Sequence, residues 1–267
     1  MIAAVRNVDK AKNQLSVYVG QIDFVAFDFE NQDSFNNAFE QIDVVFLLRP
    51  PHISDVNRVF EPLINYLVGA KIKQVVFLSV QGVEKSKIIP HHKIEKLLIA
   101  SGLDYIFVRP SYFMQNLTTT LLQDIQEKRK IILPAGKAKF NWVDVGDIGL
   151  FTALMLTEFE QYKNQAFEVT CHENKNFEAV ARFINAVVED KIEYKNMNPI
   201  CFYRYKKKMA MPKGLILVMI MLHFLPRFQK EPNVSKAFEE ITGQEPTSLK
   251  EFITREQAKF QNKTSNA

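Results

Sequence analysis

Short apolar runs alternate with helical patterns along the first 110 residues, and this alternation restricts the fold more than any other feature. The runs at 25–29, 43–48 and 74–80 predict buried strands, and a further strand is predicted at 104–110. Amphipathic patterns at 31–42, 54–69 and 92–101 predict the helices between them. Strands that alternate with helices pair in parallel through right-handed crossovers. The sequence therefore predicts an α/β, doubly wound parallel sheet.

The alternation loosens after residue 110. A short strand is expected to enter a helix near Asp147, which is predicted to be that helix's N-cap, and one more strand is expected at 166–170. From residue 176 the pattern is mainly helical. We therefore expect a nucleotide-type domain over 1–150 and a smaller, mainly helical lobe over 151–267.

Charge and cysteine content give limited information about partners and location. The net charge of +4 comes from 34 basic and 30 acidic residues spread along 267 positions, which does not favour nucleic-acid binding. The run Lys206-Lys207-Lys208 predicts a solvated surface. Cys171 and Cys201 have no metal-ligand spacing and form no disulfide framework, so no metal site and a cytoplasmic location are expected.

The most apolar stretch covers residues 214–225 and includes His223. Its 12 residues are well short of the roughly 20 that a membrane-spanning helix needs. A buried helix, or a lid over a pocket, is the expected structure. An interfacial membrane anchor stays open as the alternative, because lysines lie nearby in the sequence.

Polar and charged residues follow the predicted strands. In an open parallel sheet, ligands bind beyond the carboxyl ends of the strands. The guanidinium of Arg6 suits the 2′-phosphate of NADP, and the alternative is an ordinary surface arginine. Asp28 would approach an adenine, or it caps the turn that follows. The residues at the strand ends are Arg6, Asp28, Leu48, Arg49, Ser79 and Arg109.

The stretch from 75 to 117, VVFLSVQGVEKSKIIPHHKIEKLLIASGLDYIFVRPSYFMQNL, resembles the NmrA-like branch of the atypical short-chain dehydrogenases/reductases. AVRNVDKA near the start and FNWVDVGDIG at 140–149 resemble further segments of the same family. The resemblance implies a Rossmann-type fold that binds NAD(P)(H). It also implies either reduction of quinones and other small carbonyl compounds or non-catalytic sensing of the cofactor's redox state.

Members of this family start with a strand and a glycine-rich turn that holds the cofactor pyrophosphate. Here only Gly20 and Gly69 precede Gly82, and neither belongs to a G-x-x-G-x-x-G element. The first strand, turn and helix are therefore expected to be missing, so that MIAAVRN forms the family's second strand. Loss of a central strand would leave backbone groups unpaired on both neighbours. Two explanations stay open: a shortened chain, or a fold completed by a strand from a second copy.

The resemblance implies cofactor contacts from Arg6, Asp28, Leu48, Arg49, Ser79 and His91. The Tyr-x-x-x-Lys pair of short-chain dehydrogenases is absent after Ser79, so His91 and Ser79 are the catalytic candidates. The alternatives are a helix-start histidine without a chemical role and a serine that satisfies local backbone. Glu95 resembles a recurrent family acid, but its place beside Lys96 also suits a solvated charge.

Tyr112, Phe113 and Asn116 follow the strand end at Arg109 and are predicted to line the substrate opening. An aromatic wall suits a flat, apolar substrate such as a quinone, although Phe113 also suits ordinary core. The sequence thus predicts an NADPH-dependent reductase, with NADP preferred over NAD because of Arg6. The alternative is a catalytically silent redox sensor with a regulatory protein partner. A nucleotide-sugar epimerase is disfavoured, and a homodimer stays open.

Overall fold

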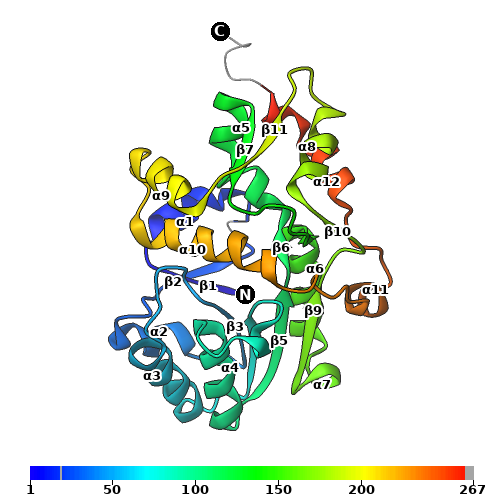
Figure 1. Cartoon of the computed structure of the whole chain (residues 1–267). Helices are drawn as coiled ribbons and strands as arrows, with labels where there is room; N and C mark the ends of the chain where they lie inside the picture. The colour runs from blue at the N-terminus through cyan, green and yellow to red at the C-terminus, as the bar shows by residue number, and fades with distance from the viewer. Residues whose placement is uncertain (19, 262–267) are drawn as a thin grey trace. The chain divides into compact units, whose positions relative to one another are not determined.

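The computed structural model describes residues 1–18 and 20–261 and divides the chain into two compact units, each built from two segments. Unit 1 comprises 1–109 and 152–167, and unit 2 comprises 110–151 and 168–267. The sequence pattern, by contrast, predicts a single division near residue 150. Figure 1 shows the elements of both units.

Unit 1 holds the α/β part of the chain. Its elements follow in the order β1 (Ile2–Val5), α1 (Val8–Gln14), η1 (Ser16–Tyr18), β2 (Asp23–Ala26), η2 (Gln32–Ser34), α2 (Phe35–Phe39), β3 (Val44–Leu48), α3 (Val56–Gly69), β4 (Gln74–Leu78), η3 (Val83–Lys85), α4 (Pro90–Ser101), β5 (Asp104–Pro110), α7 (Phe159–Tyr162) and β9 (Gln165–Val169). β5 and β9 each run across the division between the units. The predicted alternation of strands and helices is confirmed.

The strands of unit 1 belong to two sheets with the orders β1-β2 and β3-β4-β5-β9. β1 pairs with β2 in parallel, and β3, β4 and β5 pair in parallel with Val44 opposite Gln74 and Gln74 opposite Asp104. Among the described residues, β1 has no partner other than β2, and β3 none other than β4. The expected absence of the family's first strand and turn stays a prediction.

Helices α3 and α4 cover one face of β3, β4 and β5 (Figure 1). α3 buries residues at helical spacing along one side: Val56, Val59, Phe60, Leu63, Ile64 and Leu67. These side chains pack against Leu47, Val75 and Phe107 of the strands. Asp55 caps α3 by accepting a hydrogen bond from the N–H of Arg58 at 3.1 Å.

Unit 2 contains short strands and most of the later helices. Its elements are β6 (Tyr112–Phe113), η4 (Met114–Leu117), α5 (Leu122–Lys128), β7 (Lys130–Leu133), β8 (Phe140–Val143), α6 (Val145–Thr157, which continues into unit 1), β10 (Asn174–Lys175), α8 (Phe177–Asn185), β11 (Glu193–Asn196), α9 (Pro199–Lys208), α10 (Lys213–Phe224), η5 (Leu225–Phe228), α11 (Ala237–Thr242), α12 (Leu249–Arg255) and η6 (Gln257–Phe260). Strands β10, β8 and β6 form one sheet, and β11 pairs with β7. Trp142 of β8 is 1% exposed within the core of this unit.

Two carboxylates near the start of α6 make contacts far along the chain. Asp144 accepts hydrogen bonds from Gln115 at 2.9 Å, from the Gly146 N–H at 2.7 Å and from Arg255 at 2.5 Å. Asp147 lies inside the helix, so its prediction as the N-cap is wrong. Its carboxylate instead accepts hydrogen bonds from the N–H and the hydroxyl of Thr247, at 2.8 and 2.9 Å. Both residues therefore have structural roles.

Two surface predictions need correction. Lys206 is 2% exposed and pairs with the buried Asp124 at 2.7 Å, so only Lys207 and Lys208 of the basic run are solvated. The apolar stretch does form a helix, α10, but only Ile216, Met219 and His223 of it are buried. No described helix is long and apolar enough to cross a membrane. Burial was predicted wrongly because a helix that is apolar on all sides gives no periodicity that separates its inner from its outer face.

Candidate cofactor site

The carboxyl ends of β3, β4 and β5 bring three predicted residues to one sheet edge. Leu48 lies opposite Leu78, which lies opposite Val108, so Arg49, Ser79 and Arg109 follow in adjacent positions. The N-terminal turn of α4 adds His91, whose Nε2 accepts a hydrogen bond from Arg49 Nε at 3.4 Å. Because ligands of open parallel sheets bind at this edge, these residues form the candidate site.

Ser79 has a buried hydroxyl without a partner. Its residue is 2% exposed, and its N–H donates to the carbonyl of Val108 at 2.8 Å. Among the described residues, its Oγ has no hydrogen-bond partner. A buried polar group of this kind costs about 1–3 kcal/mol unless something satisfies it. The predicted alternative, satisfaction by local backbone, is therefore wrong for this side chain, and a bound ligand or an ordered water molecule would satisfy it.

Arg49 is largely committed to the loop that follows β3. Its Nη1 donates to the carbonyl oxygens of Pro50, Pro51 and Ile53, at 2.9, 3.2 and 2.6 Å. The guanidinium thereby satisfies three backbone carbonyl oxygens of this loop. Its positive charge still lies at the end of β3 beside His91, but Nη1 already donates to these three carbonyl oxygens. Leu48, the residue before it, is 53% exposed.

His91 is held neutral. Burial, together with the positive charge of Arg49, lowers the pKa of His91 to about 4. Its ring centroid lies 6.0 Å from that of Phe77, which is fully buried. Since Nε2 accepts from Arg49, the proton of the neutral ring is assigned to Nδ1. At neutral pH this side chain is thus a hydrogen-bond donor, and it is not a cationic acid.

Glu95 is an ion-pair partner and not a solvated charge. The residue is 5% exposed and accepts two hydrogen bonds from Arg109, at 2.9 and 2.6 Å. Arg109 also lies 3.6 Å from Glu84. Glu95 follows His91 by one helical turn, so the bidentate pair fixes α4 to the end of β5 on the side that carries His91.

Arg6 and Asp28 lie on the other sheet of unit 1. The Arg6 side chain is exposed, and no hydrogen bond or ion pair of its guanidinium occurs among the described residues. Asp28 accepts a hydrogen bond from the N–H of Glu30 at 3.0 Å, and its own N–H donates to Ser34 Oγ at 3.0 Å. The turn-capping role of Asp28 is therefore present, and its contact with a cofactor stays a prediction.

The predicted substrate residues belong to unit 2. Tyr112 packs among Phe140, Trp142 and Phe177, and its hydroxyl lies 2.9 Å from His223 Nε2. Burial raises the pKa of Tyr112 well above its ordinary value, against a smaller opposing effect of a hydrogen bond with Asn116. Tyr112, Phe113 and Asn116 are each half-buried. The Tyr112–His223 pair could not be predicted from the sequence, because its members are 111 positions apart and no local pattern links them.

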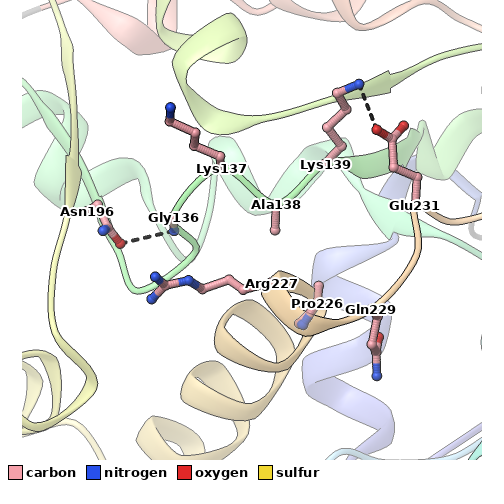
Figure 2. A pocket seen from close by; sticks show the side chains of 9 residues that line it. All are labelled: Gly136, Lys137, Ala138, Lys139, Asn196, Pro226, Arg227, Gln229 and Glu231. Carbon is pink, nitrogen blue, oxygen red and sulfur yellow. Dashed lines mark hydrogen bonds and ion pairs between the residues drawn. The ribbon is translucent and has the colours of Figure 1, made fainter.

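A pocket of about 560 Å³ lies within unit 2 and contains none of the predicted site residues. Figure 2 shows its lining residues, Gly136, Lys137, Ala138, Lys139, Asn196, Pro226, Arg227, Gln229 and Glu231. Lys139 pairs with Glu231 at 2.7 Å, while Lys137 and Arg227 point in different directions (Figure 2). The cationic side chains of this pocket therefore do not converge on one position. In the described part of the chain, no group of His, Cys, Asp and Glu residues is arranged to hold a metal.

Comparisons with known proteins agree with the fold. The model of the NmrA-like family matches residues 1–256. Prestalk A differentiation protein A of Dictyostelium discoideum is 27% identical over 233 residues, which is 86% of this chain and 75% of that protein. The chain superposes on the triphenylmethane reductase of Citrobacter sp. complexed with NADP(H), with a TM-score of 0.81, 20% identity, and coverage of 95% of this chain and 89% of that one. For the Escherichia coli NADPH-dependent quinone oxidoreductase complexed with NADPH, the TM-score is 0.84 at 19% identity, with the same coverage.

Proposed function

This chain belongs to the NmrA-like family of NAD(P)-binding proteins, and on that premise we propose that it binds NADPH and reduces a small quinone or carbonyl compound. The observation that carries the proposal is the buried, unpartnered Ser79 hydroxyl at the carboxyl edge of the sheet. Two of the superposable structures are reductases described with NADP(H) or NADPH, and one of these is a quinone oxidoreductase. NADP is proposed over NAD because of the exposed Arg6 guanidinium.

The residues present fit a dinucleotide in part. Ser79 and the Nδ1–H of His91 would donate hydrogen bonds to the cofactor or to a substrate oxygen, and Arg49 would supply positive charge near the phosphates. The sequence has no G-x-x-G-x-x-G element to provide a row of backbone N–H groups for the pyrophosphate.

The proposed chemistry places few demands on acid–base groups. NADPH would supply hydride, and the protein would orient the two reactants. His91 is neutral because its pKa is about 4, and Tyr112 keeps its proton because burial raises its pKa. Neither group would change protonation near pH 7, so the proton that completes reduction of a carbonyl oxygen would come from solvent.

Turnover tests this function. Mixing the protein with NADPH and a small benzoquinone should give NADPH oxidation, followed by its absorbance, at a rate that saturates with quinone. Replacing NADPH by NADH should lower the rate at subsaturating cofactor, because NADH lacks the 2′-phosphate. Binding of NADPH without oxidation would contradict the reductase proposal and favour the redox-sensor alternative.

Ser79→Ala separates stability from binding. We expect the unliganded variant to be more stable than the parent by about 1 kcal/mol, because it no longer buries an unpaired hydroxyl. Its affinity for NADPH should fall several-fold, measured by calorimetric titration. Thr152→Val is the matched control, because Thr152 Oγ1 is also buried without a partner but lies on α6. That variant should gain stability and bind NADPH as the parent does; equal losses of affinity in both would count against a role for Ser79.

A further inference from the structure

Helix α10 exposes an apolar surface that its own unit leaves uncovered. Ile216, Met219 and His223 follow helical spacing and anchor the helix to the core of unit 2. His223 Nδ1 donates to the Met219 carbonyl at 2.6 Å, so Nε2 accepts a hydrogen bond from the Tyr112 hydroxyl at 2.9 Å. The side chains on the remaining arc are between 40 and 49% exposed: Leu215, Leu217, Val218, Met221, Leu222 and Leu225. Phe228, in the turn that follows, is 73% exposed.

Such a surface is unusual for a helix with one face in the core. Helices of this kind normally carry polar residues on the outer side, whereas α10 has none between Gly214 and Met221. Exposed apolar residues that form a contiguous patch mark an interaction surface, while single ones need no explanation. The spacing of Leu215, Val218, Leu222 and Leu225 places these four on one stripe, and Leu217 and Met221 form the adjacent stripe.

The charges around α10 have a single sign. Residues 196–230, which include α9 and α10, contain seven basic residues and no Asp or Glu. Lys206 is the one that is buried, against Asp124. The others are exposed and have no carboxylate within ion-pair distance in the described part of the chain: Arg204, Lys207, Lys208, Lys213, Arg227 and Lys230. α9 and α10 are neighbours within unit 2 (Figure 1), so the helix that carries Arg204, Lys207 and Lys208 lies beside the helix that carries the apolar arc.

We propose that α10, with the basic residues of α9 and of the turn after α10, docks on the surface of an anionic lipid membrane. An apolar helix face flanked by lysine and arginine is the pattern of helices that lie in the plane of a membrane interface. The apolar arc would enter the boundary of the acyl chains, while the cations would meet the lipid phosphates. A second copy of this face is disfavoured as the occupant, because it would bring six unpaired cations against six others. The proposal does not depend on NADPH binding or turnover.

Vesicle flotation of the full chain tests this docking. We expect flotation with vesicles in which about a third of the lipid is phosphatidylglycerol, and little with pure phosphatidylcholine. Raising the salt from roughly 0.05 to 0.5 M should weaken the binding several-fold, because surface charges are screened. Equal binding to both kinds of vesicle, or none to either, would overturn the proposal.

Paired variants locate the surface. Val218→Ser/Leu222→Ser should lower the vesicle partition coefficient at least tenfold. Val68→Ser/Ile99→Ser removes apolar side chains of matching exposure from α3 and α4 and should leave the partition coefficient unchanged. Lys207→Glu/Lys208→Glu should abolish the preference for anionic lipid, whereas Lys10→Glu/Lys12→Glu on α1 should keep it. Circular dichroism checks the fold of each variant.

The same variants identify a competing occupant. If the parent is a dimer by light scattering, does not float with anionic vesicles, and becomes a monomer in Val218→Ser/Leu222→Ser, the face is a contact between copies. That outcome would overturn membrane docking. Membrane docking would be supported if the parent is a monomer that floats with anionic vesicles and Val218→Ser/Leu222→Ser does not float.

Discussion

Asp124→Ala is expected to destabilise unit 2 by about 3–5 kcal/mol, because it leaves a buried lysine without its counter-ion. Asp124 is 2% exposed and accepts hydrogen bonds from Lys206 at 2.7 Å and from Lys128 at 3.3 Å, and a further one from Tyr205. Burial alone would raise the pKa of Asp124, but the bonds from Lys206 and its neighbours outweigh burial and lower it. The carboxylate is therefore charged at neutral pH, and its removal exposes the cost of burying the Lys206 ammonium.

Two variants make this prediction specific. Glu127→Ala removes an exposed carboxylate from the same helix, α5, and should change the free energy of unfolding by less than about 0.5 kcal/mol. Asp124→Ala/Lys206→Met removes both charges and should recover a substantial part of the loss. The measurement is urea unfolding followed by the fluorescence of Trp142, which lies in the core of the same unit. A loss of less than about 1 kcal/mol in Asp124→Ala would contradict the assignment of a buried ion pair.

Stability should fall steeply as the pH is lowered from about 6.5 to about 4, through the histidines of both units. Burial, aided by Arg49, lowers the pKa of His91 to about 4. Burial also lowers the pKa of His223 to about 4, against the opposing hydrogen bond to the Met219 carbonyl. The ordinary pKa of histidine is about 6.5, so in this window the unfolded chain binds protons that the folded chain does not. For each histidine, the free energy of unfolding then falls by up to about 1.4 kcal/mol per pH unit. This amounts to about 3 kcal/mol per histidine over the window.

Unfolding free energies at several pH values between 7 and 4 test this slope. His91→Asn should reduce the pH dependence of the unfolding free energy of unit 1, and His223→Asn that of unit 2. Each reduction should correspond to the uptake of about one proton on unfolding. A slope that neither buried-histidine variant alters would show that these side chains titrate as they do in the unfolded chain.

The sequence predicted the elements of unit 1 well because local patterns determine them. The apolar runs of β3, β4 and β5 lie within a residue or two of their predicted bounds, and Gly102 ends α4 in the left-handed conformation expected of a glycine at that point. The resemblance to the NmrA-like family is confirmed by the match over residues 1–256. Because parallel register follows from these strands, the positions of Arg49 and Ser79 at one edge were predictable as well.

Contacts between distant segments were not predictable from such patterns. The hydrogen bond from Thr247 to Asp147 links residues 100 positions apart, and the ion pair of Lys206 with Asp124 links residues 82 positions apart. The periodicity of the sequence does not indicate that one lysine of a basic run is buried against a carboxylate on another helix. Similarly, the coupling of Arg49 to His91 depends on where α4 packs, which is a property of the tertiary fold.

The central claim is that the edge formed by Arg49, Ser79 and His91 is the NADPH site, and chemical-shift mapping of the full chain tests it most directly. In a titration of ¹⁵N-labelled protein with NADPH, we expect the largest backbone amide shifts at 48–49, 52–53, 79–83 and 91–92, together with a saturable change in the His91 ring signals. Ser79→Ala should shift the titration to higher NADPH concentration. No saturable shifts, or shifts confined to unit 2, would contradict the claim.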